Sequence, residues 1–474
     1  MTNPPHTVKT RIAPSPTGNL HVGTAKTALF NFLFARHNNG EFILRIEDTD
    51  FKRSGKKFEE NIIDGLKWLG ISWDGNVIRQ SDRINLYEEY LKRLINNGSA
   101  FYCQHSEKEL EEECDKQMRI GESPRHYCSH REKNLKDGLI RFRNDKNEII
   151  EFQDVIRGTI SFNPALIGDF SLAKNLRTPL YNFAAAVDDF AMQISHVIRG
   201  EDHISNTPKQ ILIQEALGFA RPIYAHLPLL LGADRSKLSK RHGATSISEY
   251  RETGYLPEAL FNFLAILGWN PGGDREVFTK EELISLFSLE RVQKAGAVFD
   301  TTKLDWMNGE YIRKKSASEL YKLAEPHLID FLRIPNTKFP ISNEYIEKIV
   351  LLEQPRLKKL SELAEKTDYF FKEPEYNSEL LIWKEQTKIQ TKEALKTALK
   401  TITDIEEQNF TKDNVEKIFL QKSSEFKNRG ELLWPLRAAL SGKKTSPGPF
   451  DIMAILGKKI SMERVHRAAE LMVK

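Results

Sequence analysis

The chain has 474 residues, of which 40% are hydrophobic and 29% charged, and its formal net charge is +4. That length exceeds one ordinary domain, and the composition excludes global disorder because enough apolar residues are present to fill several cores. Both charge signs are abundant, so a nucleic-acid surface must be a local patch and cannot be inferred from the net charge.

The cysteine content and the apolar stretches indicate where the protein works. Its three cysteines, Cys103, Cys114 and Cys128, are too few and odd in number for a disulfide framework, which favours a reducing compartment. The segment Met1–Lys9 is polar, so we expect no signal peptide. The most apolar stretches are far shorter than the roughly 20 residues of a membrane span. We therefore expect a soluble cytoplasmic protein with no membrane partner.

The first hundred residues alternate between strand and helix patterns. Val8–Ile12 and Phe42–Ile46 have the apolar character of buried strands. Thr24–Arg36 and Phe58–Leu69 repeat apolar residues at helical spacing, and Asn38-Asn39-Gly40 stops the first of these helices. This rhythm predicts a parallel sheet covered by helices.

A charged and irregular stretch interrupts that rhythm from Phe101 to about Asn175. Its short strand candidates are Leu139–Phe142 and Thr159–Phe162, and we interpret it as an insertion between two halves of the sheet. The strand and helix rhythm then returns over Tyr181–Val187, Gln193–Arg199 and the helical Pro208–Leu217.

Beyond Thr245 the chain is predicted to be helical, with Pro/Gly-rich breaks at Trp269–Gly273 and Ser446–Pro449. The expected helices are Pro257–Leu267, Lys280–Phe287, Ser316–Leu332, Asn343–Leu360, Thr391–Ile402 and Met462–Val473. The predicted fold is α/β plus all-α. A Rossmann-type parallel-sheet domain (1–100 and 176–244) carries an inserted α+β domain (101–175), and a mostly helical region (245–325) and an all-helical domain (326–474) follow.

Two segments carry candidate chemistry. The first, PSPTGNLHVGT at 14–24, joins the first strand to its helix. Ligands of open α/β sheets bind beyond the carboxyl ends of the strands, and helix N-termini favour anions. Gly23 has no Cβ, so a phosphate could approach the backbone, and His21 could donate a hydrogen bond to a phosphate oxygen. On spacing alone, a structural turn with a solvent-facing histidine carries equal weight.

The second segment is DRSKLSKRHG at 234–243, which follows an apolar strand candidate. Lysines interleaved with serines on a loop can neutralise a triphosphate and give way when pyrophosphate leaves. Taken alone, such a run is more often a solvated surface loop.

Together the two segments resemble the two signature motifs of class I aminoacyl-tRNA synthetases. Their neighbours narrow the resemblance to bacterial glutamyl-tRNA synthetases, whose motifs match in order and spacing over nearly the whole chain. The matching segments are RIAPSPTG at 11–18, RIEDTD at 45–50, VDD at 187–189, VIRGEDH at 197–203, KLSKR at 237–241, FDTTKLDWMNG at 299–309 and PLRAALSG at 435–442.

This resemblance implies an ATP-dependent ligase, acting as a monomer, that joins L-glutamate to the 3′-terminal adenosine of tRNA(Glu) through a glutamyl-adenylate. Mg²⁺ would bridge the phosphates of ATP. The implied catalytic residues are His21, Lys237 and Lys240. The implied ATP contacts are Pro14, Ser15, Thr17, His21, Gly23, Thr24, Lys237, Ser239, Lys240 and Arg241. The implied glutamate contacts are Arg11, Ser15, Glu47, Tyr181 and Arg199.

The charges of the implied contact residues suit a glutamate ligand. Arg199 would pair the side-chain carboxylate, because its planar fork makes two parallel hydrogen bonds and rejects neutral glutamine. Glu47 would face the ammonium group. Without the family context, Arg11 and Glu47 read as ordinary surface ion pairs. Ala185 stands where some relatives carry an asparagine near the substrate, which puts one polar contact in doubt.

The resemblance also places a structural Zn²⁺ site and the tRNA contacts. Cys103, His105, Cys128 and His130 form a C-x-H…C-x-H set, which suits tetrahedral zinc. Some relatives have C-x-C and C-x-H there and many lack the metal, so a buried thiol beside solvent-facing histidines carries equal weight.

The inserted domain is expected to bind the acceptor stem, the region 245–325 to contact the stem, and the domain 326–474 to read the anticodon. The positions that match anticodon contacts are Arg356, Arg437, Ser446 and Pro447. Whether tRNA(Gln) is also charged stays open.

Three alternatives are disfavoured. Glutaminyl-tRNA synthetases usually carry a β-barrel anticodon region and a Pro-Glu-Pro-type start, whereas this chain has a helical tail and Pro14-Ser15-Pro16. The truncated enzyme that glutamylates a modified tRNA base lacks the tail. Non-catalytic tRNA-binding paralogues tend to lose the two signature motifs, and both are intact here.

Overall fold

A computed structural model describes residues 7–50, 52–332 and 342–472. The side chains of Lys240 and of residues 330–332 lie outside the described part. The chain divides into two compact units, Met1–Arg251 with Pro257–Leu304 and Glu252–Leu256 with Asp305–Lys474. Among the described residues, no helix combines the length and apolar character that crossing a bilayer requires.

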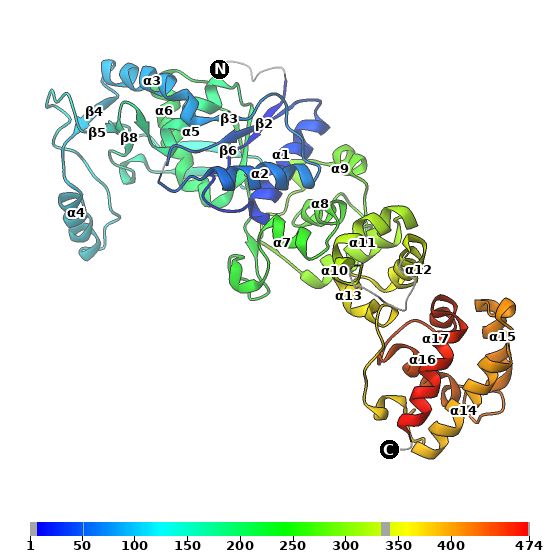
Figure 1. The fold of residues 1–474 in the computed structure, drawn as a ribbon. Helices are drawn as coiled ribbons and strands as arrows, with labels where there is room; N and C mark the ends of the chain where they lie inside the picture. The colour runs from blue at the N-terminus through cyan, green and yellow to red at the C-terminus, as the bar shows by residue number, and fades with distance from the viewer. Residues whose placement is uncertain (1–6, 51, 333–341, 473–474) are drawn as a thin grey trace. The chain divides into compact units, whose positions relative to one another are not determined.

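The first unit opens with the predicted strand and helix alternation (Figure 1). A parallel sheet in the order β1-β2-β3 is formed by β1 (Lys9–Ile12), β2 (Glu41–Ile46) and β3 (Ile78–Arg79). The helices that follow the strands are α1 (Val22–His37), α2 (Lys56–Trp68) and α3 (Ile84–Asn96). Helix α1 packs against β1 and β2 through a nearly continuous set of buried side chains, which explains why it is apolar on almost every face.

A second set of parallel strands lies beside β1. Strand β10 (His196–Gly200) pairs with β11 (Ile223–Leu227) in parallel register. Strands β1 and β10 are joined through Ser195, whose backbone N–H donates to the Lys9 carbonyl at 3.0 Å and whose Oγ accepts from the Lys9 N–H at 2.7 Å. The strand after β1, which is β2, pairs on one side of this junction, and the strand after β10, which is β11, pairs on the other. The carboxyl ends of β1 and β10 therefore flank a topological switch point, where open α/β sheets bind ligands.

The segment Tyr181–Val187 belongs to a helix, α5 (Tyr181–Ala191), and is not a strand of the expected strand and helix alternation. Its three consecutive alanines, Ala184 to Ala186, favour helix, and the segment contains only one β-branched residue, Val187. Helix α6 (Thr207–Leu217) agrees with the prediction and ends at Gly218 in the left-handed conformation.

The predicted insertion contains an antiparallel sheet of four strands in the order β4-β5-β8-β9. These strands are β4 (Ala100–Cys103), β5 (Leu139–Phe142), β8 (Ser171–Asn175) and β9 (Thr178–Pro179), with helix α4 (Glu107–Arg119) between the first two. The hairpin of β6 (Ile150–Asp154) and β7 (Gly158–Phe162) instead extends the sheet of β10 and β11, because Asp154 pairs with Tyr224 in parallel register. The domain boundaries of the insertion stay a prediction.

The remainder of the first unit is mostly helical. It contains the short paired strands β12 (Leu230–Leu231) and β13 (Ala297–Val298), the helices α8 (Pro257–Ile266) and α9 (Lys280–Leu286), and the start of α10 (Thr301–Arg313). Helix α7 (Ile247–Glu252) follows the Lys/Ser/Arg loop.

The second unit contains only helices and turns among its described residues. Its main helices are α11 (Ala317–Leu332), α12 (Asn343–Glu353), α13 (Glu362–Thr367), α14 (Lys388–Asp404), α15 (Lys412–Ser423), α16 (Gly430–Ser441) and α17 (Pro449–Leu471). The expected helix Asn343–Leu360 ends early, because Pro355 follows closely and supplies no N–H to continue it.

The last expected helix, Met462–Val473, is the second half of α17, and Val473 lies outside the described residues. The expected break at Ser446–Pro449 ends at the start of α17, where Pro449 takes the first helical position that proline prefers.

Gly40 tests the packing that holds β1 beside β2. An added Cβ would lie 2.1 Å from the carbonyl oxygen of Val8, so Gly40→Ala must push β1 away from β2. We expect a loss of about 1–3 kcal/mol in the free energy of unfolding, measured by urea titration. Gly18→Ala is the control, because no atom lies within 4 Å of its added Cβ. Equal midpoints for the two variants would contradict this packing.

Candidate active site

A cavity of about 450 Å³ lies at the carboxyl ends of β1 and β10. Two segments that are far apart in sequence reach it, the one that begins α1 and the loop that follows β12. The predicted ATP and glutamate residues that line it are Arg11, Pro14, Ser15, His21, Gly23, Thr24, Glu47, Tyr181, Arg199 and Lys237. Thr17, Ser239 and Arg241 are not part of its lining, and the Lys240 side chain lies outside the described residues.

The charged side chains of the cavity favour an anionic ligand. Four lining residues are cationic, Arg11, Lys26, Arg199 and Lys237, and two are acidic, Glu47 and Asp202. Asp202 pairs with Lys237 at 3.5 Å. Within the described part of the chain, neither Lys26 nor Arg199 has a carboxylate within ion-pair distance, so both charges are left for a ligand to compensate.

His21 caps helix α1 and presents one defined ring nitrogen to the cavity. Its Nδ1 accepts a hydrogen bond from the Gly23 N–H at 3.0 Å, and the Val22 N–H donates to the Thr245 carbonyl. Burial, with Lys237 as the next cause, lowers the pKa of His21, so the ring is neutral at pH 7. A neutral ring that accepts at Nδ1 carries its proton on Nε2, which makes Nε2–H the available donor.

Gly23 leaves space for the His21 ring, a role that the motif spacing did not indicate. A Cβ at Gly23 would lie 3.2 Å from Nδ1 of His21, which is tight for a ring that must fold back over its own helix. The glycine therefore makes room for the histidine as well as for a ligand.

The late loop is folded around Asp234. The carboxylate of Asp234 accepts hydrogen bonds from the Ser236 N–H at 2.9 Å and from its hydroxyl at 2.7 Å. It also contacts His242 Nε2 at 3.1 Å and pairs with Arg241 at 3.3 Å. Lys237 is not part of this cluster; its side chain is mostly exposed and reaches Asp202 in the cavity lining, as expected of a lysine that is accessible to an incoming phosphate.

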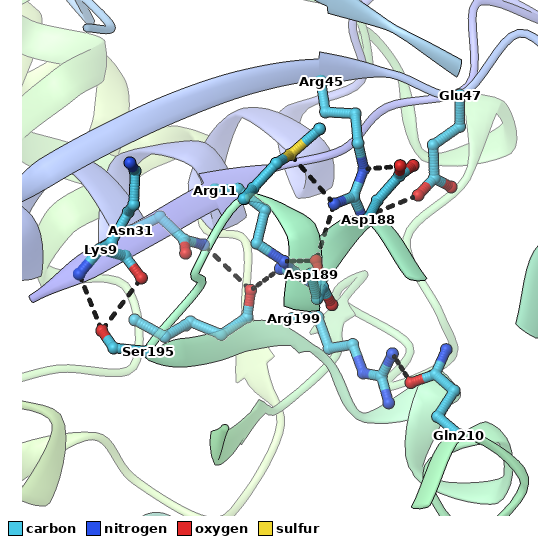
Figure 2. Close-up of polar contacts among 12 residues, drawn as sticks. Lys9, Arg11, Asn31, Arg45, Glu47, Asp188, Asp189, Ser195, Arg199 and Gln210 are labelled. Atoms are coloured by element: carbon cyan, nitrogen blue, oxygen red, sulfur yellow. Dashed lines mark hydrogen bonds and ion pairs between the residues drawn. The ribbon is translucent and has the colours of Figure 1, made fainter. Parts of the chain in front are cut away.

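Beneath the cavity lies a buried ion-pair network that joins three elements of the fold (Figure 2). Arg11 on β1 forms a two-pronged pair with Asp189 on α5, with Nε–Oδ1 at 3.0 Å and Nη2–Oδ2 at 3.3 Å. Arg45 on β2 contacts the same Asp189 at 2.7 Å and reaches Glu47 at 3.2 Å. Because Arg11 and Glu47 are buried, the surface-ion-pair alternative for them is wrong.

Asp188 extends the network to the start of α3. Its carboxylate accepts from Arg83 at 2.7 Å and from Gln80 and Tyr87 at 2.8 Å each. The network thus contains three arginines and three carboxylates, Arg11, Arg45, Arg83, Glu47, Asp188 and Asp189. The charges balance, which is the condition for burying ions at tolerable cost.

Arg199 is held differently from Arg11, because all of its partners among the described residues are neutral. Its Nη1 donates to Gln210 Oε1 at 2.9 Å and to the Tyr181 hydroxyl at 3.4 Å, and its Nη2 donates to Thr207 Oγ1 at 2.8 Å. Its Nε donates to His226 Nε2 at 3.2 Å. The guanidinium is fixed in orientation and keeps its full positive charge at the cavity wall.

Several of these residues were part of quoted motifs but had no expected role. Arg45, Asp188 and Asp189 were visible as charges inside otherwise apolar strand and helix patterns, which is a signal of buried pairing. Lys26 was not singled out. Its amine is buried without a hydrogen-bond partner, and burial lowers its pKa to about 8.

The cysteine cluster of the insertion differs from the predicted set in one member. The side chains whose ligand atoms lie within 4.8 Å of one another are Cys103, His105, His126 and Cys128. His130 instead stacks on the His105 ring, with 4.2 Å between centroids, and its Nδ1 accepts from the Gln104 N–H.

The predicted anticodon residues lie in the second unit. Arg356 pairs with the buried Glu353 at 2.9 Å. Arg437 donates to Ser446 Oγ at 2.8 Å, next to Pro447, and its guanidinium lies 4.5 Å from the centroid of the Trp434 ring. Arg356 is also close enough to lower the pKa of Arg437, after burial as the larger cause.

Comparison with known proteins agrees with the fold. Residues 7–306 match the family model described as tRNA synthetases class I (E and Q), catalytic domain, and residues 319–469 match an anticodon binding domain. The fold is thus that of a class I aminoacyl-tRNA synthetase.

Individual relatives specify the family further. A glutamate–tRNA ligase of Carboxydothermus hydrogenoformans is 44% identical, covering 97% of this chain and 99% of that protein. One of Bacillus licheniformis is 41% identical over 97% of this chain and 98% of that protein. The crystal structure of a glutamate tRNA ligase from Elizabethkingia meningosepticum in complex with its amino acid matches with a TM-score of 0.86 at 30% identity, covering 98% of this chain and 99% of that one. The chain therefore belongs to the glutamate–tRNA ligase family.

Asp189 offers a test of the buried network by pH. Burial alone would raise its pKa, but Arg11 and Arg45 outweigh burial and lower it to about 2. Asp189→Asn leaves both guanidiniums short of a charge partner, so we expect a loss of about 3–5 kcal/mol in the free energy of unfolding at pH 7.

A depressed pKa stabilises the folded state above the unfolded pKa of about 4, and that contribution disappears as the pH falls toward 2. The difference between wild type and Asp189→Asn in urea unfolding should therefore shrink between about pH 4 and pH 2. A difference that is constant over this range would show that Asp189 does not carry its charge in the network.

Proposed function

We propose that this chain activates L-glutamate with ATP and transfers the glutamyl group to the 3′-terminal adenosine of tRNA(Glu), through a glutamyl-adenylate. The observation that carries the proposal is the single cavity shared by His21, Lys237 and Arg199. Membership of the glutamate–tRNA ligase family supports the choice of substrates. As a tRNA-charging enzyme, the chain would act as a cytoplasmic monomer.

In the first step, an oxygen of the glutamate α-carboxylate attacks the α-phosphorus of ATP in line, and the bond from that phosphorus to the bridging oxygen of pyrophosphate breaks. Such a reaction needs positioning and charge stabilisation more than covalent help. His21 donates its Nε2–H to a phosphate oxygen, and Lys237 neutralises the departing pyrophosphate together with Lys240. Mg²⁺, when carried in by the nucleotide, would shield the phosphate charges.

The glutamate substrate is selected by the fixed charges of the cavity. Arg199 pairs the side-chain carboxylate, which compensates a buried cation whose described partners are all neutral. Glutamine presents an amide and leaves that charge uncompensated. Glu47 and Ser15, which follow β2 and β1, also line the cavity, and the ammonium group would bind beside Glu47.

In the second step, the 2′ hydroxyl of the terminal ribose attacks the carbonyl carbon of the adenylate, and AMP leaves.

We propose that Arg356, Arg437, Ser446 and Pro447 contact anticodon bases, because an arginine held beside a tryptophan ring suits unstacked bases. Charging of tRNA(Gln) in addition to tRNA(Glu) is best examined by presenting the two tRNAs side by side.

The proposed activity is tested by ATP–pyrophosphate exchange with glutamate in the presence of tRNA(Glu). Lys237→Ala should lower the exchange rate by about 100-fold or more, because one charge is removed from the transferring phosphates. Arg235→Ala is the matched control from the same loop, since Arg235 is exposed and does not line the cavity. Near-normal exchange by Lys237→Ala, or exchange that proceeds equally with glutamine, would refute the assignment.

We also propose that Cys103, His105, His126 and Cys128 hold one structural Zn²⁺. The Sγ atoms of Cys103 and Cys128 lie 3.3 and 3.5 Å from His105 Nδ1, close to the roughly 3.3–3.8 Å between ligand atoms of a tetrahedral zinc. His126 contacts Glu113 with Nδ1 at 2.5 Å, while its buried Nε2 has no hydrogen-bond partner among the described residues. A carboxylate on one ring nitrogen and an open second nitrogen are typical of a metal-bound histidine.

Metal analysis distinguishes this ligand set from the one with His130. We expect about one zinc per chain in the wild type and in His130→Ala, and clearly less than one in His126→Ala, because a tetrahedral site loses most of its affinity with one ligand. Zinc loss in His130→Ala with retention in His126→Ala would instead establish the set predicted from the sequence. A wild type that stays far below one zinc after metal loading would exclude both.

A further inference from the structure

The cavity contains two buried arginines that the fold treats in opposite ways. Arg11 is paired directly with Asp189, so its charge is neutralised within the protein. Arg199 is equally buried, yet none of its described partners is a carboxylate. The nearest acid that reaches it through hydrogen bonds is Asp154, with the His226 ring between them.

Asp154, His226 and Arg199 form a continuous buried chain. His226 Nδ1 lies 2.6 Å from Asp154 Oδ2, and Arg199 Nε lies 3.2 Å from His226 Nε2. Asp154 is anchored by three backbone N–H groups, those of Ile156 at 3.0 Å, Arg157 at 2.8 Å and His226 at 3.0 Å. Both Asp154 and His226 are essentially inaccessible to solvent.

The hydrogen-bond pattern fixes the tautomer of His226. An acid that already accepts three backbone N–H groups is an acceptor, so His226 must carry a proton on Nδ1. Burial, as the largest cause, lowers the pKa of His226, so the ring is neutral and its Nε2 has a lone pair. That lone pair accepts from Arg199 Nε, and Thr207 Oγ1 lies 3.2 Å from the same nitrogen.

We propose that Asp154 and His226 are positioning residues that hold the Arg199 guanidinium in the orientation needed for the side-chain carboxylate of glutamate. This inference rests on the proposed function and adds to it the residues that prepare the specificity-determining cation. The imidazole acts as a neutral spacer between two charges. A carboxylate bound directly to Arg199 would neutralise it and compete with the substrate, whereas a neutral acceptor fixes Nε and leaves the charge in place.

Strand β6 carries Asp154 to this site. That strand meets the sheet at the Asp154–Tyr224 bridge, two residues before His226 on β11. The pairing of β6 with β11 therefore brings Asp154 beneath the histidine.

The test compares two substitutions of His226 in glutamate-dependent pyrophosphate exchange. His226→Phe removes the acceptor for Arg199 Nε, and we expect the KM for glutamate to rise about tenfold or more, with the KM for ATP changed by less than about twofold. His226→Gln can place its side-chain oxygen where Nε2 was, so it should restore the KM for glutamate to within about threefold of the wild type.

Asn262→Ala is the control for lost stability. Asn262 is fully buried and bonds the Phe278 N–H and the Glu276 carbonyl, yet it does not line the cavity. It should lower the melting temperature without separating the two KM values. Equal rises in both KM values for His226→Phe, or a KM for glutamate that is unchanged, would overturn the inference. Failure of the wild type itself to activate glutamate would refute the proposed function instead.

A spectroscopic measurement covers the case in which His226→Phe does not fold. In protein labelled with ¹⁵N-histidine, the His226 signals are identified by their loss in His226→Gln. We expect the ring of the wild type to carry its proton on Nδ1 with Nε2 unprotonated. A proton on Nε2 would remove the acceptor for Arg199 and would overturn the inference.

Discussion

The structure of the site depends on the buried contact between Asp189 and the two arginines Arg11 and Arg45. These three residues come from α5, β1 and β2, so one carboxylate ties together elements that are remote in sequence. A buried ion network of this kind adds little net stability compared with apolar packing, but breaking it is costly, because each partner is left charged in a dry environment. It therefore specifies one arrangement of the strands, and with it the positions of the side chains at their carboxyl ends.

The cations in the cavity and in the network beneath it fall into groups with different tasks. Arg11 and Arg45 are neutralised inside the protein and act as structure. Arg199 is held by neutral groups, and Lys237 is largely exposed beside Asp202, so their charges remain available to a ligand. Under the proposed function, this division would let one small space take up an amino acid with two carboxylates and a nucleotide with three phosphates, because the protein's own acids do not neutralise Arg199.

Much of this architecture could be predicted because the informative patterns are local. The turn-rich segment before α1, the glycine after His21 and the lysine loop each lie in one short stretch, and their joint resemblance to the two signature motifs of class I aminoacyl-tRNA synthetases predicted a shared site. The contacts between distant segments could not be predicted in the same way. Nothing near Asp154 in sequence indicates that β6 joins β11 and places it under His226. Similarly, the choice of His126 over His130 depends on how the loop after α4 folds back, and the number of residues between ligands does not determine it.

The central claim is that one cavity binds both halves of a glutamyl-adenylate, with Arg199 on the amino-acid side and His21 on the phosphate side. The most direct test is a crystal structure with a non-reactive glutamyl-sulfamoyl-adenosine. We expect the Arg199 guanidinium to pair with the glutamate side-chain carboxylate and His21 Nε2 to contact the sulfamoyl linkage. A bound analogue whose side-chain carboxylate lies away from Arg199, or whose linkage is out of reach of His21, would contradict this account.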